Sequence, residues 1–338
     1  MNILVTGGAG FIGSHTVVEL YQAGFKPVIL DDLSNSNEQM LKGIEQIIND
    51  TVPFIKGNCQ DEDTLRDIFK TYQIAGVLHF AAAKAVGESV QNPIKYYDLN
   101  IGSMIAVLKV MREFKVQNFV FSSSCTVYGE PEVIPVTEET PRQPATSPYG
   151  NTKTIGEDIL RDLVKSGDNF SIISLRYFNP IGAHESALIG ELPNGVPNNL
   201  VPYITQTAIG KRESLTIFGD DYDTPDGTNI RDFIHVVDLA KAHVSALRYL
   251  TEVQAPFYDV FNLGTGSGNS VLELVKTFEK VNELKLNYSL GPRRPGDTVK
   301  IYGDPTKANN ILKWKTEKTL AEGLKDAWRW EQKLANKK

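Results

Sequence analysis

The stretch Thr6-Gly7-Gly8-Ala9-Gly10-Phe11-Ile12-Gly13 decides the fold of this chain. A short apolar strand, Asn2 to Val5, precedes it, and a helix is predicted after it from Ser14 to Gln22. A glycine turn between a strand and a helix is typical of a dinucleotide-binding unit. The first glycine allows the tight turn, the second lets the backbone approach a pyrophosphate, and the third lets helix and strand pack closely. The helix N-terminus would offer its N–H groups to the phosphates.

An acidic residue at the end of the second predicted strand extends this pattern. Pro27 to Leu30 is apolar and leads to Asp31, which lies 18 residues after Gly13. A carboxylate at this place can hold the hydroxyls of the adenosine ribose, which favours NAD over NADP. The alternative is an ordinary turn aspartate that ends a strand.

Strands and helices then alternate along the first half of the chain. Further strands are predicted over 52–56, 77–80, 118–121 and 170–176, with helices between them that include 65–71 and 101–114. This alternation predicts an α/β fold with a Rossmann-type doubly wound parallel sheet. We expect residues 1–180, joined by 232–265, to form the NAD-binding domain, and 181–338 to form a smaller C-terminal α/β substrate domain. His79 lies inside an apolar strand, so we expect a core histidine rather than a ligand.

Tyr149 and Lys153 are the candidate acid–base pair. They are four residues apart beside a helix predicted over 154–164, so their side chains would leave one helical face. A phenol has an unperturbed pKa of about 10. A neighbouring lysine cation favours the phenolate and lowers that pKa, which would make Tyr149 a base for a hydroxyl proton. Taken alone, such a spacing more often belongs to an exposed helix. Ser122 to Ser124 end a predicted strand at the edge where parallel sheets carry their chemistry.

Composition excludes several classes of protein. The 338 residues are 41% hydrophobic and 22% charged, which is ordinary for a globular protein. A net charge of −6 gives no general footprint for nucleic acid. Cys59 and Cys125 form neither a metal-type cluster nor a disulfide framework, and we expect both to be reduced, in a cytoplasmic protein. We expect no metal, no secretory leader and no membrane span.

Several longer strings carry a more specific resemblance. The chain resembles the UDP-glucose 4-epimerase family of the extended short-chain dehydrogenase/reductase superfamily over essentially its whole length. The strings that carry it are 6–15, 79–89, 122–129, 147–150, 175–180, 197–200, 231–236 and 293–297.

The resemblance implies a reaction and a set of residues. Tyr149 would be the base, Lys153 would tune it and bind the nicotinamide ribose, and Ser124 would hydrogen-bond the reacting sugar hydroxyl. The cofactor would be tightly bound NAD, contacted by these three residues and by Gly7, Gly10, Phe11, Ile12, Gly13, Asp31, Asp32, Leu33, Ser34, Asn35, Ser36, Asn58, Cys59, Phe80, Ala81, Ala82, Ala83, Lys84, Asn100 and Phe178. A UDP-sugar would contact Ser124 and Tyr149 together with Lys84, Tyr177, Asn179, Asn199, Leu200, Thr216, Ile217, Phe218, Arg231, Arg294, Asp297 and Ile301.

Such an enzyme interconverts UDP-galactose and UDP-glucose through a transient 4-keto sugar, in galactose metabolism, as a homodimer. Arginines at the diphosphate have a physical reason, because a guanidinium matches it in two-point geometry. The chain departs from the family at three positions. Asn58 replaces the aspartate that would accept a hydrogen bond from the adenine amino group, and its amide oxygen can still accept that bond. Leu99 replaces an asparagine, so a cofactor contact is lost there. Ile301 is neither the tyrosine nor the smaller residue usual at its position, so it leaves the acceptance of N-acetylated sugars open.

Alternative functions differ in the residues that they require. A UDP-N-acetylglucosamine 4-epimerase, or another NAD-dependent nucleotide-sugar enzyme of this fold, would use the same set. A 4,6-dehydratase carries an Asp-Glu pair where this chain has Ser124-Cys125-Thr126. A non-catalytic NAD sensor would have no use for a tuned phenol. A second glycine turn, 264–268, imitates a dinucleotide site, but no acid ends a strand about 20 residues later, so a turn with Ser270 capping a helix is favoured.

Overall fold

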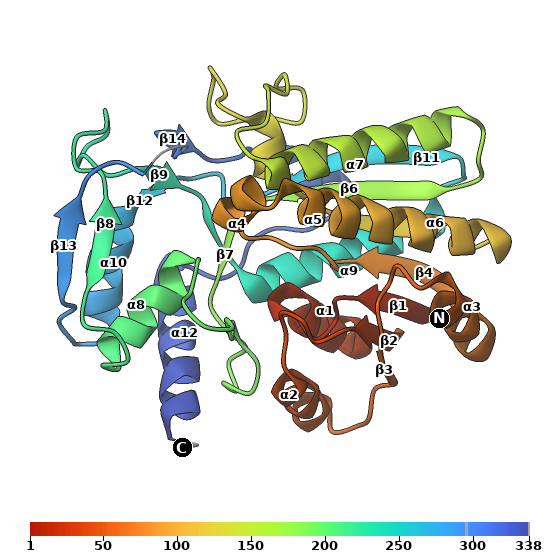
Figure 1. Ribbon diagram of the computed structural model, residues 1–338, viewed down its shortest axis with the longest axis horizontal. Coiled ribbons are helices and arrows are strands. Elements are labelled where there is room, and N and C mark those ends of the chain that lie inside the picture. The colour runs from red at the N-terminus through yellow and green to blue at the C-terminus, as the bar shows by residue number, and fades with distance from the viewer. Residues whose placement is uncertain (295–296, 337–338) are drawn as a thin grey trace.

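A seven-stranded parallel sheet organises the chain (Figure 1). The computed structural model describes residues 1–294 and 297–336; Pro295 and Gly296 of the basic loop 293–297 lie outside it, as do 337–338 of the predicted C-terminal domain. In spatial order the strands are β11 (Phe257–Leu263), β6 (Ser171–Tyr177), β5 (Asn118–Ser124), β4 (Ile74–His79), β1 (Asn2–Thr6), β2 (Lys26–Asp31) and β3 (Phe54–Lys56).

The strand order reverses between β1 and β4. The chain builds outward from β1 to β2 and β3, then crosses back to β4 and continues to β5 and β6. In open parallel sheets the ligand crevice lies at this switch point, beyond the carboxyl ends of the strands. The two loops are in close contact here: a Cβ on Gly7, which has φ of +71°, would lie 2.8 Å from the backbone nitrogen of Ala81.

Helices cover both faces of the sheet because its strands are apolar on both faces. Phe119 and Val120 are neighbours on β5, yet they belong to different core clusters. One face packs on α1 (Phe11–Gln22), α2 (Glu38–Ile48), α9 (Val236–Glu252) and α11 (Thr306–Ile311). The other packs on α3 (Glu62–Tyr72), α6 (Ser103–Glu113) and α7 (Pro148–Lys165). The Rossmann-type doubly wound fold is therefore as predicted.

The C-terminal elements build a smaller α/β unit around a third core cluster, seen on the left of Figure 1. Its helices are α8 (Leu200–Ala208), α10 (Val271–Val281) and α12 (Leu320–Ala335). Its short strand pairings are β8 (Leu215–Phe218) with β13 (Tyr288–Gly291), and β9 (Ile230–Arg231) with β12 (Asn269–Ser270) and β14 (Lys300–Ile301). β7 (Asn179–Ile181) and β10 (Phe233–His235) pair between this unit and the large sheet.

Some predicted boundaries were wrong. α1 begins at Phe11 and not at Ser14, because Gly10 is its N-cap and the Ser14 amide already bonds the Gly10 carbonyl at 2.9 Å. β3 begins at Phe54 and not at residue 52. The helix predicted over 101–114 starts in a π-helical turn, Asp98–Gly102, that precedes α6. Helix α2 and the short helices α4 (Val86–Gln91) and α5 (Pro93–Tyr97) were missed.

The second glycine turn is structural, as predicted. Ser270 caps α10 in a capping box with Glu273. Within the turn, the amide and hydroxyl of Thr265 donate to the buried carboxylate of Asp232, at 2.8 to 3.1 Å. His79 is also a core residue: it is buried in β4, and its Nδ1 lies 2.8 Å from the Thr6 hydroxyl of β1.

A buried ion pair joins α7 to the sheet. Arg176 of β6 donates to both carboxylate oxygens of Glu157 on α7, at 2.8 and 2.6 Å. Ser123 of β5 donates to the same carboxylate at 2.6 Å. Glu157 and Arg176 are 1% and 5% exposed. If one of them were removed, water could not reach the other to solvate its charge. The pair fixes the position of α7 over β5 and β6.

We expect Arg176→Met to lower the free energy of unfolding by about 3–5 kcal/mol, because it leaves the buried Glu157 carboxylate without its two short hydrogen bonds and with only Arg142, 3.7 Å away, as a cation. Adding Glu157→Leu in the double variant should restore a large part of the loss, since no buried charge then remains. Urea unfolding measures all three proteins. Arg161→Met is the matched control, because its pair with Asp158 is exposed and should change stability by less than about 1 kcal/mol. A single variant as stable as the unaltered chain would contradict this account.

Candidate active site

The glycine turn leaves room for a ligand at the N-terminus of α1. Gly13 is required by packing, because a Cβ there would lie 2.2 Å from the Gly7 carbonyl oxygen. A Cβ on Gly10 would meet only that oxygen, at 3.1 Å, and its φ of −75° is open to any residue. No side chain caps α1. The bare Gly10 and the uncapped N–H groups of Phe11, Ile12 and Gly13 therefore fit the close approach of a dinucleotide pyrophosphate.

Asp31 organises the loop after β2. Its carboxylate accepts from the amides of Ala9 and Leu33, at 3.0 and 2.9 Å, and from the hydroxyl of Ser36 at 2.7 Å. These bonds join the glycine turn to the predicted cofactor segment Asp31 to Ser36. Two carboxylate oxygens can accept about four hydrogen bonds, so capacity for a ribose hydroxyl is left.

Other predicted cofactor residues follow β3 and β4. They differ in how far their side chains are exposed. Cys59 is 8% exposed and packs in the core with α3 and α6. Asn58 is exposed, and its side-chain oxygen already accepts from the Gln60 amide at 2.9 Å. The ring of Phe80 packs against that of His243, tilted by 48°, at a centroid distance of 4.7 Å. The segment Phe80 to Lys84 leaves the carboxyl end of β4 beside the glycine turn.

Asn100 is a support for that segment. It is buried on the π-helical turn, its oxygen accepts from the Ala83 amide at 2.8 Å, and its nitrogen donates to the Ala83 carbonyl and to Thr152, each at 3.0 Å. Both amide protons are therefore used within the protein. The direct cofactor contact predicted for Asn100 stays a prediction, and what the structure shows is a link between the loop after β4 and α7.

The three predicted catalytic residues lie where β5 meets α7. Ser124 is the last residue of β5, and Tyr149 is the second residue of α7, which begins at Pro148 with Ser147 as its N-cap. Lys153 is one turn further along and is 4% exposed. Its Nζ donates to the Ser122 carbonyl at 2.6 Å and lies 5.8 Å from the centroid of the Tyr149 ring.

The electrostatics of this pair differ from the expected lowering. Burial raises the pKa of Tyr149 to about 12, with Cys125 acting in the same direction and the Ser124 hydroxyl acting against it. Burial lowers the pKa of Lys153 to about 8. The lysine does not lower the pKa of the phenol here, because its ammonium is directed at the Ser122 carbonyl and is itself disfavoured by burial. Tyr149 needs a further positive charge or hydrogen bond to become a base.

The predicted UDP residues of the C-terminal unit form two groups. In the first, β9 pairs with β14 so that Arg231 lies opposite Ile301, and Arg294 pairs with Asp297 at 2.7 Å. Burial lowers the pKa of Arg231, and Asp297 acts in the opposite direction. Over residues 1–294 and 297–336, no carboxylate lies within ion-pair distance of Arg231, whose one hydrogen bond goes to the Ile230 carbonyl. A half-buried arginine without a carboxylate fits an anionic ligand.

The second group is at α8 and β8. Asn199 is the N-cap of α8 but its side chain does not cap the helix, so the N–H groups that begin with Leu200 are open to an anion. The amide of Leu215, which begins β8, donates to the carbonyl of Asn287 just before β13, and the amide of Gly219, just after β8, donates to the carbonyl of Gly291. Alternation along the strand turns the backbone groups of Thr216 and Phe218 to the other edge. The side chain of Ile217 is 1% exposed and packs in the third core cluster, and its predicted ligand contact stays a prediction.

An apolar cluster joins the C-terminal residues to the catalytic strand. Phe178 and Ile301 are 5% and 6% exposed and pack together with Val127, and Cys125 packs against them. Cys125 follows Ser124 directly. Tyr177 is buried at the end of β6 with its hydroxyl on Ser122, while Asn179 is exposed on β7. The structure thus places Ser124, Tyr149 and the Arg231 group around one cluster.

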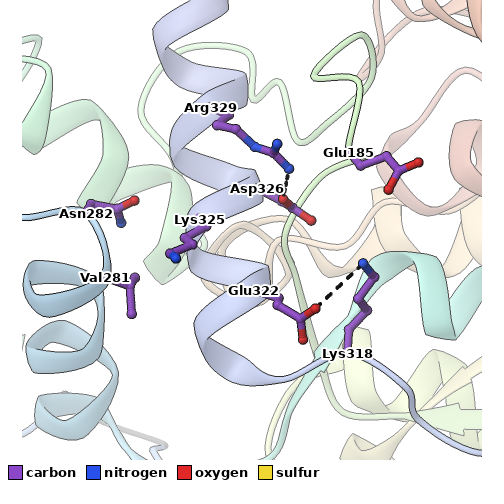
Figure 2. A pocket seen from close by; sticks show the side chains of 8 residues that line it. All are labelled: Glu185, Val281, Asn282, Lys318, Glu322, Lys325, Asp326 and Arg329. Carbon is purple, nitrogen blue, oxygen red and sulfur yellow. Dashed lines mark hydrogen bonds and ion pairs between the residues drawn. The ribbon is translucent and has the colours of Figure 1, made fainter.

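A surface hollow of about 420 Å³ lies elsewhere, between α10 and α12. Figure 2 shows its lining of mixed charge, in which Arg329 pairs with Asp326, and Lys318 lies 3.8 Å from Glu322. None of its lining residues belongs to the predicted site, and four of its charged residues pair with one another. The candidate site is therefore the loop-lined edge of the sheet and not this hollow. Within the part of the chain that the structure describes, no group of three His, Cys, Asp or Glu residues could hold a metal, and no helix is long and apolar enough to cross a membrane.

Two acidic residues at the candidate site, Asp232 and Glu191, were not identified from the sequence. Asp232 is fully buried, burial raises its pKa to about 6, and it accepts from Thr265 and from the Gly303 amide. Glu191 accepts from Lys84 and Asn199. Asp232 stands next to Arg231 in a string already singled out, which is a usable signal. Glu191 lies in a loop without periodicity, and its partner Lys84 is distant in the sequence.

Comparison with known proteins gives the family. A family model described as GDP-mannose 4,6 dehydratase matches residues 4–327. The UDP-glucose 4-epimerase of Pasteurella multocida is 53% identical over 334 residues, which cover 98% of each chain. A crystal structure of UDP-glucose 4-epimerase from Stenotrophomonas maltophila with bound NAD and formylated UDP-arabinopyranose is 44% identical, with a TM-score of 0.97 over 100% of both chains. That from Bifidobacterium longum, in complex with NAD⁺ and UDP, is 46% identical, with a TM-score of 0.95 over 99% of both.

These matches span both halves of the chain, including β5 and the predicted UDP residues of the C-terminal unit. The relatives share the fold at full length and carry one name. The chain belongs to the UDP-glucose 4-epimerase family.

Proposed function

We propose that this chain is an NAD-dependent UDP-glucose 4-epimerase that interconverts UDP-galactose and UDP-glucose in galactose metabolism. The observation that carries the proposal is the meeting of Ser124, Tyr149 and Lys153 at the sheet edge that also carries the open glycine turn. Relatives crystallised with NAD and with UDP or a UDP-sugar support the choice of ligands. The division into residues 1–180 with 232–265 for NAD and 181–338 for the UDP-sugar belongs to this proposal.

The residues present fit NAD. The bare Gly10, the open N-terminus of α1 and the Asp31 carboxylate would hold its pyrophosphate and adenosine ribose, and Lys153 would hold the other ribose. When bound, NAD supplies the hydride acceptor for C4 of the sugar and, in its oxidised form, a positive charge. Because a cation favours a phenolate, a charged ligand in this site supplies what Tyr149 lacks in the free protein.

The chain's own residues then handle the proton and the substrate. Tyr149 takes the proton of the sugar 4-hydroxyl and returns it, while Ser124 hydrogen-bonds that hydroxyl. Arg231, Arg294 and the N-terminus of α8 hold the diphosphate, and the backbone edge of Thr216 and Phe218 faces the uracil. A tether at the UDP end would let the 4-keto sugar turn and present its other face, which inversion at C4 requires.

A dehydratase, which the description of the family model names, is disfavoured at the catalytic strand. Elimination needs a carboxylate pair after β5, and this chain has Ser124, Cys125 and Thr126 there. A non-catalytic NAD sensor is disfavoured by Lys153, since a buried ammonium directed at a carbonyl is costly and serves no packing role. Turnover separates all three functions.

The first test uses the purified protein and UDP-galactose with no added cofactor, and follows UDP-glucose. Conversion is expected, because NAD is regenerated in each cycle and can stay bound. Tyr149→Phe should lower kcat by a factor of about 10² to 10⁴ while UDP affinity stays within about twofold. Tyr21→Phe is the control, since it removes an exposed phenol that bonds only Asp50. No conversion with or without added NAD would refute the proposal, and near-normal turnover of the Tyr149 variant would remove it as the base.

The burial of Lys153 predicts a pH-dependent stability. Its pKa is about 8 in the folded protein and about 10.4 in an unfolded chain, so between these values the unfolded chain binds more protons and stability rises with pH. Lys153→Met should therefore unfold with a free energy about 1–3 kcal/mol higher than the unaltered ligand-free protein at pH 7. The gain should shrink from pH 8 to pH 10. Lys165→Met, at the exposed end of α7, should change stability by less than about 0.5 kcal/mol. A Lys153 variant that is less stable at pH 7 would contradict this reading.

We also propose that the protein is a cytoplasmic homodimer. Support comes from α4 and α5, which expose Val86, Val90 and Ile94 by 50%, 62% and 80%. A second copy would cover this apolar face. Sedimentation should give twice the mass of one chain, and Ile94→Lys should shift the mass towards one chain. A monomer at all concentrations would refute this part.

A further inference from the structure

The backbone before Glu191 is held from two sides. Gly190 packs so tightly on the indole of Trp330 that a Cβ would lie 2.6 Å from the ring, and the indole N–H of Trp330 donates to the Glu191 carbonyl at 2.9 Å. On the other side, a Cβ on Gly43 of α2 would lie 2.3 Å from the Leu188 carbonyl oxygen. In Figure 1 the chain after β7 accordingly runs between α12 and the helices α1 and α2. The backbone of Glu191 is therefore fixed in position.

Its side chain reaches two predicted ligand contacts at once. Oε1 of Glu191 accepts from Nζ of Lys84 at 3.1 Å and from Nδ2 of Asn199 at 2.5 Å. Lys84 ends the loop after β4, on the predicted cofactor side, and Asn199 begins α8, on the predicted UDP side. The Glu191 side chain is 11% exposed, whereas that of Lys84 is 47% exposed. The acid is therefore the ordered centre of the three residues.

Both partners keep donors for a ligand. An ammonium has three N–H donors and a side-chain amide has two, so after bonding Glu191 the lysine keeps two and Asn199 keeps one, together with its carbonyl oxygen. A ligand can thus bind both without breaking the bonds to Glu191. Without the acid, a flexible lysine and an exposed asparagine would have to be ordered during binding, which costs about 0.5–1.5 kcal/mol for each side chain.

A second contact shows that the same segment spans the site. Asn194 donates to the carbonyl of Ser34, in the loop after β2, at 3.3 Å. Residues 190–199 therefore touch the loops after β2 and β4 before they enter α8. The two halves of the candidate site are joined here by side chains from one segment.

We propose that Glu191 is a positioning residue for the UDP-sugar, which acts by holding Lys84 and Asn199 in their binding orientation. This inference rests on the proposed function. It assigns no chemical step to Glu191, because its carboxylate is committed to Lys84 and Asn199.

The test compares Glu191→Ala and Glu191→Gln with the unaltered holoprotein, by UDP titration calorimetry and by steady-state kinetics with UDP-galactose. Loss of charge-assisted hydrogen bonds predicts that Glu191→Ala raises the Kd for UDP and the KM by about tenfold, with kcat within about twofold. Glu191→Gln keeps the acceptor and should stay within about threefold. Glu185→Gln, which removes an exposed acid from the same segment, should be unchanged. Thermal unfolding should not move in any of these variants by more than a few degrees.

A second arm asks whether the effect passes through Lys84. In a Lys84→Met background, Glu191→Ala should change the Kd by less than about threefold, since one of its two partners is already gone. Tighter UDP binding by Glu191→Gln would overturn the inference, because the acid would then be a competitor of the diphosphate. Unchanged Kd and KM in Glu191→Ala would also overturn it. If the unaltered protein binds no UDP at all, the proposed function fails instead.

Discussion

The bidentate ion pair between Glu157 and Arg176 is the interaction on which the catalytic geometry depends. Tyr149, Lys153 and Glu157 are spaced by four residues on α7, so they lie along one face of that helix. Glu157 is bonded by Arg176 of β6 and by Ser123 of β5, the neighbours of Tyr177 and Ser124. Whatever holds Glu157 therefore also sets the distance from Tyr149 to Ser124. A charge pair buried this deeply adds little net stability, but it admits only one arrangement of its three elements.

The same burial shifts the pKa of Tyr149 and the pKa of Lys153 against their charged states. Low hydration raises the pKa of Tyr149 to about 12 and lowers that of Lys153 to about 8, so both effects disfavour the charged state that each group needs. Desolvation here exceeds the attraction between the two, because the ammonium lies 5.8 Å from the ring and bonds a carbonyl. A cation bound beside Tyr149 would favour its phenolate. Proton transfer is thereby coupled to the presence of cofactor, which suits an enzyme that keeps NAD through its cycle.

The sequence predicts best where a function needs a local pattern. The glycine turn requires three glycines in eight residues, and Tyr149 and Lys153 require one helical turn, so both could be identified without the fold. The parallel sheet followed from apolar strands that alternate with helices. The sequence fails where partners are chosen across the chain. The sequence did not indicate that the ammonium of Lys153 bonds the Ser122 carbonyl, that Asn100 bonds Ala83 and Thr152, or that the side chain of Ile217 lies in the core. Those outcomes depend on which groups the folded chain brings within hydrogen-bond distance.

Three carboxylates hold the loops of the candidate site together, and none of them is predicted to take part in a reaction step. Asp31 gathers the loop that follows β2, Asp232 joins the second glycine turn to Gly303, and Glu191 joins the loop after β4 to α8. Each carboxylate accepts from at least two segments that are far apart in the sequence. Loops at a sheet edge lack the backbone ladders that order strands and helices, so side-chain acceptors must do this instead. The candidate site is therefore built from groups at the strand ends and from carboxylates that hold the surrounding loops in place.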